Sequence, residues 1–104
     1  MKIYIAGKIT GLPADTAFRN FDRAEKKLKD EGHMVINPMR MYEYDLEHHR
    51  YMAIARNILC DEGTEAVYML DNWRDSPGAM EEHDMAEQIG LPIYYEDSAK
   101  EVRE

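Results

Sequence analysis

Short apolar runs alternate along the chain with longer amphipathic stretches. The apolar runs predict four strands, at residues 2–6, 34–37, 66–70 and 91–95. The stretches between them predict three helices, at about residues 15–31, 47–60 and 78–89. Strands that alternate with helices form right-handed βαβ units around a parallel sheet, so the sequence predicts an α/β fold.

The succession of elements predicts a small flavodoxin-like (Rossmann-like) three-layer sandwich with a parallel sheet of order 2-1-3-4. This order reverses between the first and third strands, and ligands of such sheets bind at the carboxyl ends of the strands beside the reversal. The loops of residues 7–13 and 71–78 flank that position. We therefore expect a binding site between these two loops.

The first two predicted helices each have one apolar face. Asp15 or Thr16 can cap the first helix, and Gly32 ends it. The residues expected to face the core are Phe18, Phe21, Ala24 and Leu28 in the first helix, and Tyr51, Ala55, Ile58 and Leu59 in the second. Residues 38–47 are expected to be irregular, and residues 96–104 are expected to form a charged tail.

The third predicted helix carries a carboxylate on its apolar face. Residues placed about 100° apart put Glu82 on one arc with four apolar residues, Ala79, Met85, Ala86 and Ile89. A carboxylate there must be desolvated, paired or beside a cavity, and each condition makes it a candidate functional group. The alternative is a surface residue, which a small shift of the helix phase would produce.

Composition narrows the classes of function. The chain has 104 residues, of which 44% are hydrophobic, and we expect one domain over residues 1–95. The formal net charge of −8 argues against a nucleic-acid polymer as partner, because its phosphates need a basic surface. A small ligand with one phosphate needs only a local site.

No stretch has the ~18 apolar residues of a membrane span, and no signal segment is evident, so we expect no membrane contact and a cytoplasmic location.

Cysteine and histidine residues predict neither a disulfide nor a metal site. Cys60 is the one cysteine, and no base is evident beside it on its helix, so we expect it to be buried by packing. The four histidines, His33, His48, His49 and His83, show no metal-ligand spacing. We therefore expect no metal and no cofactor.

The first loop has two glycines after the first strand. It contains Gly7, Lys8, Ile9 and Gly11, at a spacing that fits neither a dinucleotide fingerprint nor a P-loop. Its backbone N–H groups can hold an anion or a sugar hydroxyl. The alternative interpretation is an ordinary tight turn.

The second loop ends where the third helix begins. Ser76 can cap this helix, and a helix N-terminus can also bind a phosphate. Trp73 can cover a base or close a pocket. The cations that are candidates for a second phosphate contact, or else are ordinary surface charges, are Lys8, Arg19, Arg40 and Arg74.

Several of these segments together resemble a known family. The segments are Ile3 to Gly11, Asn20-Phe21, Asn37-Pro38, Trp73, Ser76 to Ala79, and Glu82. In this order, over about residues 1–95, they resemble the DUF4406 family of small proteins, which is frequent in phages and has no settled activity. That family is similar in turn to the nucleoside 2-deoxyribosyltransferase superfamily, which includes the deoxynucleoside 5′-monophosphate N-glycosidases.

The resemblance implies roles for individual residues. The glycosidase pattern Ser-x-Gly-x-x-x-Glu matches Ser76, Gly78 and Glu82. By this match Glu82 is the nucleophile, and Ser76 contacts a 5′-phosphate. Tyr4 and Gly7 would line the site of the sugar and the base.

The general acid and one orienting residue are less well defined. Asp71, Asp75 or a bound water would protonate the leaving base. Related sequences carry an aspartate that orients the nucleophile or the sugar, and Asn57 stands at that position here. Asparagine can form hydrogen bonds, but it supplies no negative charge and accepts no proton.

The resemblance therefore implies an N-glycosidase or 2-deoxyribosyltransferase-like enzyme that attacks C1′ through Glu82. The expected partner is a small nucleoside or deoxynucleotide. The small size and a pocket near one sheet edge also predict a homo-oligomer, as in the similar enzymes. Two alternatives are a non-catalytic nucleotide-binding module, which Asn57 favours, and a phage-encoded interaction protein.

Overall fold

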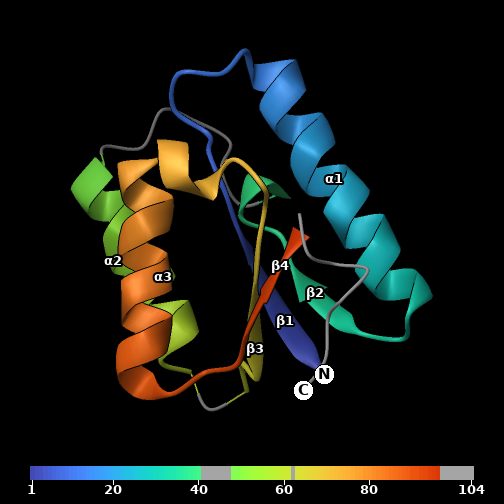
Figure 1. Ribbon diagram of the computed structural model, residues 1–104, viewed down its shortest axis with the longest axis vertical. Coiled ribbons are helices and arrows are strands. Elements are labelled where there is room, and N and C mark those ends of the chain that lie inside the picture. Colours follow the sequence, from blue (N-terminus) through green and yellow to red (C-terminus); the bar gives the residue numbers. More distant parts are fainter. Residues whose placement is uncertain (41–47, 62, 97–104) are drawn as a thin grey trace.

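The computed structural model describes residues 1–40, 48–61 and 63–96. In these ranges the strands are β1 (Lys2–Ala6), β2 (Met34–Ile36), β3 (Ala66–Met69) and β4 (Ile93–Tyr95), and the helices are α1 (Ala14–Asp30), α2 (His48–Leu59) and α3 (Pro77–Ile89) (Figure 1). The short 3-10 helices η1 (Pro38–Arg40) and η2 (Trp73–Asp75) follow β2 and β3. None of the helices described is both long and apolar enough to cross a membrane.

The described strands form one parallel sheet of order β2-β1-β3-β4, which confirms the predicted fold class and order. Tyr4 in the centre of β1 pairs with Ile36 on one side and with Val67 on the other. The sheet order reverses between β1 and β3, as expected. The loops after β1 and β3 therefore lie next to each other.

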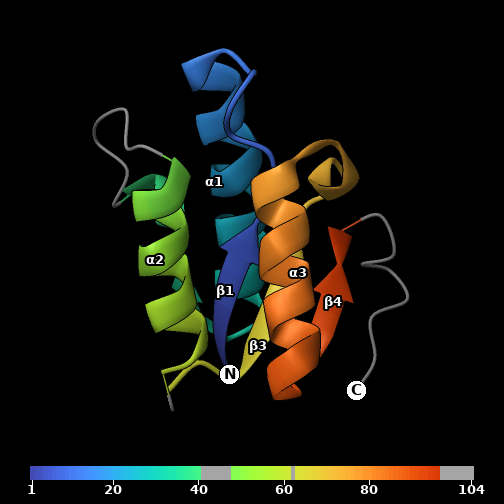
Figure 2. The same ribbon diagram turned by 90° about the vertical axis from the view of Figure 1, so that its left-hand side faces the viewer.

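Helices cover both faces of the sheet. Helix α1 lies on one face, and α2 and α3 lie side by side on the other, so the molecule has three layers (Figures 1 and 2). Alternate residues of β1 enter different cores, because side chains of a strand point to opposite faces. Ile3 and Ile5 pack with Phe21 of α1, whereas Tyr4 and Ala6 share a buried cluster with residues of α2 and α3.

The start and the phase of α1 differ from the prediction. The helix begins at Ala14 after Pro13, and no side chain caps it, so the expected cap at Asp15 or Thr16 is wrong. Pro13 occupies the N-cap position with φ at −55°, and its side chain has no acceptor for the N–H groups of the first turn. Phe18 is 41% exposed, contrary to expectation, and Ala17 is buried in its place.

The expected face of α3 is correct at its centre and wrong at its end. Ala79, Glu82 and Ala86 are buried, but Ile89 is 47% exposed. Ile89 is the last residue of the helix, and Gly90 follows in the left-handed conformation, so the chain turns away from the core there. His83 is buried although the arc did not include it.

Cys60 is exposed, so the expectation that packing buries it is wrong. The buried face of α2 contains Met52, Ala55 and Leu59, and Cys60 follows the end of the helix.

Three further expectations fall wholly or partly outside the described residues. Tyr51 lies outside the described side chains. Of the segment expected to be irregular, residues 38–40 form η1, and residues 41–47 lie outside the described part of the chain. The same holds for residues 97–104 of the expected tail.

Candidate functional site

Glu82 is buried completely, with 0% of its surface exposed. The Tyr4 hydroxyl donates a hydrogen bond to its Oε2, with an O···O distance of 2.5 Å. Tyr4 belongs to the central strand β1, and Glu82 lies in the second turn of α3, 78 residues later in the sequence. The burial excludes the alternative that Glu82 is a surface residue.

Apolar side chains from the sheet and from α2 and α3 pack around Tyr4. Tyr4 shares its buried cluster with three small residues, Ala6, Ala55 and Ala79. Small side chains let α2 and α3 approach the sheet closely, and this closeness brings the Glu82 carboxylate within reach of β1. A carboxylate in such surroundings has lost its water shell, so a hydrogen bond from a phenol contributes more to holding it than it would at the surface.

Ser76 positions the helix that carries Glu82. Its Oγ accepts a hydrogen bond from the backbone N–H of Ala79 at 3.1 Å, and Pro77 occupies the first helical position. The predicted N-cap is therefore confirmed. Gly78 lies in the first turn of α3, and the contact of Ser76 with a phosphate stays a prediction.

The two loops beside the reversal of sheet order are joined to each other. The backbone N–H of Lys8 donates to Asn72 Oδ1 at 3.0 Å. Gly7 lies against Leu70, and a Cβ atom at position 7 would come within 2.5 Å of Leu70 Cδ1. Only glycine fits there without displacing Leu70, the buried residue just before the second loop, which explains the residue type at this position.

The tip of the first loop forms a turn. The N–H of Leu12 donates to the carbonyl of Ile9 at 3.3 Å, and Gly11 has a φ of +93°. The ordinary-turn interpretation is therefore sufficient for Gly11. Ile9 packs against the core on the α1 face of the sheet. Binding of a sugar or an anion by Ile9 and Gly11 stays a prediction.

The DUF4406 family model, described as a domain of unknown function, matches residues 1–95. The chain belongs to the DUF4406 family. No curated protein and no solved structure matches it. Membership in DUF4406 assigns no activity, so the contacts of the side chains must support any proposal.

Trp73 of this DUF4406 protein packs against other side chains of the same protein. Only 8% of it is exposed, and its ring stacks on His83 with centroids 4.3 Å apart and planes 12° apart. The Tyr95 ring lies tilted at 5.9 Å, and the Arg74 guanidinium lies 4.8 Å from the Trp73 centroid. These contacts join Trp73 to α3 and β4. Whether Trp73 covers a base or closes a pocket stays a prediction.

The structure does not bring the other two predicted catalytic residues to Glu82. Asn57 is exposed on α2, on a side that the buried residues of that helix do not share. Asp71 is exposed after β3, and its backbone N–H donates to Glu96 Oε1 at 3.1 Å. Among the described contacts, neither Asn57 nor Asp71 reaches the Glu82 carboxylate. Their catalytic roles stay predictions.

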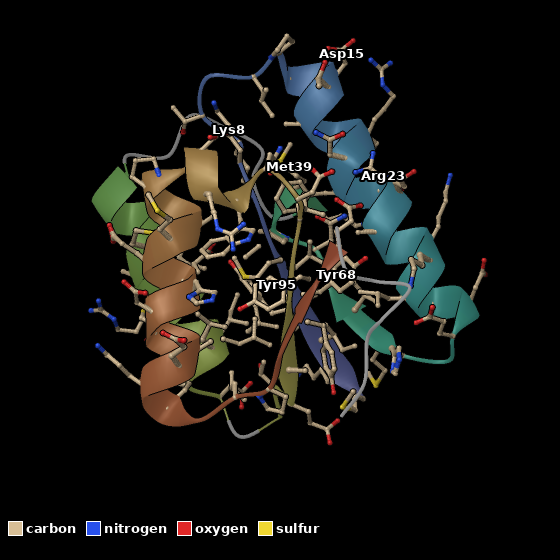
Figure 3. The ribbon with its side chains drawn as sticks, in the orientation of Figure 1. Lys8, Asp15, Arg23, Met39, Tyr68 and Tyr95 are labelled. Carbon is tan, nitrogen blue, oxygen red and sulfur yellow. The ribbon has the colours of Figure 1, made fainter. Side chains whose placement is uncertain are left out.

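Most of the candidate phosphate-binding cations have partners. Arg19 lies 3.6 Å from Asp15, and Arg74 lies over Trp73. Arg40 donates to the buried Glu25 at 2.8 Å. Lys8 is at the loop end of the sheet (Figure 3), and no carboxylate of the described residues lies within 4.0 Å of its ammonium group.

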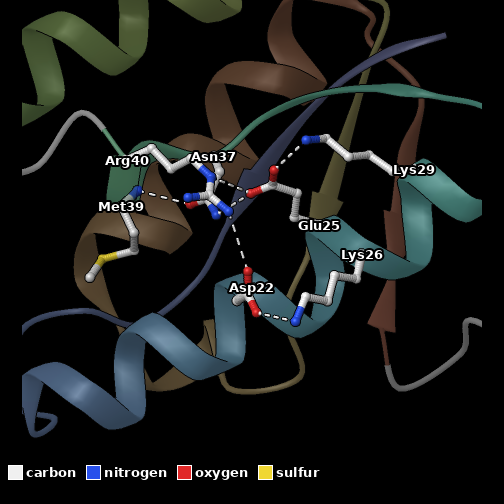
Figure 4. A network of polar contacts seen from close by, with 7 residues as sticks. All are labelled: Asp22, Glu25, Lys26, Lys29, Asn37, Met39 and Arg40. Carbon is white, nitrogen blue, oxygen red and sulfur yellow. Dashed lines mark hydrogen bonds and ion pairs between the residues drawn. The ribbon is translucent and has the colours of Figure 1, made fainter.

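A second buried carboxylate lies in the α1 layer, and the sequence analysis missed it. Glu25 is 3% exposed and binds Asn37 Nδ2 at 2.8 Å, Arg40 Nε at 2.8 Å and Lys29 Nζ at 2.7 Å (Figure 4). Burial alone would raise the pKa of Glu25, but the hydrogen bonds from these three residues outweigh it and lower the pKa to about 2. Asp22 binds the other side of Arg40 at 3.3 Å.

A helical-wheel signal for Glu25 was present in the sequence. Glu25 follows Phe21 by four residues and precedes Leu28 by three, so it lies on the arc of the buried face of α1. The argument that identified Glu82 therefore applies equally to Glu25. Periodicity finds a buried carboxylate, and only the neighbouring side chains show which groups surround it.

Proposed function

We propose that this DUF4406 protein is a nucleoside or deoxynucleotide N-glycosidase, or a 2-deoxyribosyltransferase-like enzyme, with Glu82 as its nucleophile. The observation that carries the proposal is the buried hydrogen bond from Tyr4 to Glu82. It holds a carboxylate in a fixed orientation on the side of β1 that faces α3. Two loops suited to holding a small ligand flank this strand and the helix at their ends.

In the proposed reaction the Glu82 carboxylate attacks C1′ of the sugar from the face opposite the base. The C1′–N bond breaks, and its electron pair leaves with the base nitrogen, which takes a proton from Asp71, Asp75 or a bound water. Water or a second base then attacks C1′ of the glycosyl–enzyme ester and restores the carboxylate, with net retention. The Tyr4 hydroxyl orients the carboxylate before attack and stabilises it when it leaves.

The 5′-phosphate would bind at the start of α3. The free N–H groups of a helix N-terminus favour an anion, and Ser76 lies at this terminus. Lys8 extends from the neighbouring loop, whose position Asn72 fixes through the Lys8 N–H. Binding energy from a phosphate held there would position C1′ relative to Glu82.

A second candidate function is a nucleotide-binding module without turnover. Two observations favour it: Glu82 has no exposed surface, and Asn57 is exposed on α2. A nucleophile must touch C1′, whereas a binding module needs only the loops and the N-terminus of α3. In that function the Tyr4–Glu82 pair would fix α3 against the sheet.

Base release distinguishes the two functions. The protein is incubated with each common deoxynucleoside and its 5′-monophosphate, and free base is measured by chromatography. We expect release that Glu82→Gln lowers by at least about 1,000-fold, as loss of a nucleophile requires. The matched control is Glu81→Gln, because Glu81 is the exposed neighbouring residue on the same helix. Thermal stabilisation by nucleotides without base release would support the binding module and contradict the enzyme.

A further inference from the structure

His83 has a fixed ring orientation. Its imidazole stacks on Trp73, with centroids 4.3 Å apart, and its Nε2 lies 2.8 Å from the Tyr95 hydroxyl. The His83 side chain is 11% exposed. A ring packed on one face and hydrogen-bonded at Nε2 has little rotational freedom, so the direction of its Nδ1 is also fixed.

The Nδ1 atom of His83 faces two carboxylates of the same helix. Asp84 Oδ1 lies 3.7 Å away and Glu87 Oε1 lies 3.9 Å away, and both carboxylates are mostly exposed. These separations are too long for hydrogen bonds. The ligand atoms of the three residues all lie within 4.8 Å of one another. Small side-chain rotations would bring them to the distances of a shared metal ion.

The hydrogen bond at Nε2 also decides what Nδ1 can do. When Nε2–H donates to the Tyr95 oxygen, Nδ1 of the neutral ring keeps its lone pair and can bind a metal. Such a hydrogen bond behind a ligating histidine is the usual second contact in metal sites. An imidazole nitrogen with two carboxylate oxygens suits a divalent transition metal, because Mg²⁺ and Ca²⁺ prefer oxygen ligands throughout.

We propose that His83, Asp84 and Glu87 form a surface site for a divalent transition-metal ion such as Zn²⁺, with Tyr95 as the residue that positions the imidazole. The remaining coordination positions would hold water. Since Tyr95 belongs to β4 and the three ligands belong to α3, a bound ion would strengthen the contact between this helix and the edge strand. The site does not depend on the function proposed for Glu82.

Sequence spacing did not predict this site because the search was for several histidines or cysteines at ligand spacing. The ligands here are one histidine and two carboxylates. His83 and Glu87 are four residues apart, which places them on the same side of a helix. The acidic residues alone would indicate only a solvated surface. The nearly buried and oriented imidazole of His83 distinguishes this group from an ordinary acidic surface.

The test uses the whole protein and zinc chloride alone. Isothermal titration gives the stoichiometry and affinity, and long-range ¹H–¹⁵N spectra report which histidine nitrogen responds. We expect one ion per chain at this site, a change at Nδ1 of His83, and affinity at least tenfold weaker for Glu87→Gln and for Asp84→Asn. The control Asp30→Asn removes the same charge from an exposed position on α1 and is expected to leave the affinity unchanged.

A further variant tests the role of Tyr95, and three results would overturn the proposal. Tyr95→Phe removes the hydrogen bond at Nε2 and is expected to weaken zinc binding and to alter the tautomer signal of His83 in the free protein. The first contrary result is no binding at millimolar zinc. The second is binding that neither carboxylate substitution changes. The third is a response at His33, which lies 3.1 Å from the N-terminal amine, in place of His83.

Discussion

The two buried carboxylates of this protein lie on opposite faces of one sheet and have different neighbours. Glu25 on α1 binds the cations Lys29 and Arg40 together with the amide of Asn37. Glu82 on α3 accepts a hydrogen bond from the phenol of Tyr4 within an apolar layer. Both are nearly or completely inaccessible to water, so burial alone does not distinguish a structural carboxylate from a reactive one.

The difference in their neighbours has a chemical consequence. Cations stabilise the negative charge of Glu25, which makes its carboxylate a poor nucleophile and a good anchor for η1. The hydrogen bond that the structure shows at Glu82 comes from the neutral phenol of Tyr4, which orients the carboxylate. We assign the Glu25 network to structure, whereas the chemical role of Glu82 is the one proposed above.

The largest expected effect on stability is that of Glu25→Gln. The substitution keeps the side-chain volume but removes the charge that Lys29 and Arg40 bind, and we expect the free energy of unfolding to fall by about 2–3 kcal/mol. Both cations are about half exposed, so we expect a smaller loss of unfolding free energy than for a fully buried ion pair. Urea denaturation measures it. Glu31→Gln, which removes an exposed charge paired with Lys27, is the control and should change stability by less than about 0.5 kcal/mol.

Acid should remove the same contribution without any substitution. The folded-state pKa of Glu25 is about 2, below the ordinary value of 4.5, so this group stabilises the fold at pH above 4.5. That stability should be lost as the pH falls from about 4.5 towards 2. The difference in unfolding free energy between the wild type and Glu25→Gln should shrink over this range. A difference that stays constant with pH would contradict the assignment of the charge network.

Tyr4→Phe removes the hydrogen bond to the other buried carboxylate, Glu82. The substitution removes the hydroxyl that binds Glu82 Oε2 and leaves the ring in place, so we expect a loss of about 1–2 kcal/mol in unfolding free energy. Base release should fall as well, because the carboxylate loses its orientation. The double variant Tyr4→Phe with Glu82→Gln completes a mutant cycle. Additive effects of the two substitutions on stability would show that the pair does not interact.

Ser76→Ala should have the smallest effect on stability. It removes the hydroxyl that accepts from the Ala79 N–H, and we expect a loss of about 1 kcal/mol. Ser76→Asp keeps an N-cap acceptor and should restore the stability. The same pair of variants also examines the phosphate proposal. The aspartate would repel a 5′-phosphate at this helix terminus, so discrimination between nucleoside and nucleotide should change although the stability does not.

Local signals in the sequence predicted much of the fold. The alternation of strands and helices indicated the α/β class, and the position of Ser76 before Pro77 indicated the cap of α3. These features depend on residues close together in the chain. The phase of α1 was wrong at Phe18, because two adjacent positions can each begin an apolar face and only packing against the sheet selects Ala17.

The contact between Tyr4 and Glu82 could not be predicted from the sequence. Tyr4 and Glu82 were both candidates, but their hydrogen bond depends on which face of β1 is covered by α3. The Glu25 network and the stack of Trp73 on His83 join separate elements in the same way. Such contacts follow from the assembled layers, so spacing along the chain does not reveal them.

The central claim is that Glu82 is the reactive carboxylate and Glu25 the structural one. The most direct measurement is base release from deoxynucleoside 5′-monophosphates by the wild type, Glu82→Gln and Glu25→Gln, at a temperature where all three are folded. We predict that Glu25→Gln releases base at close to the wild-type rate and that Glu82→Gln releases almost none. Release by Glu82→Gln at the wild-type rate, or no release by the wild type itself, would contradict the claim.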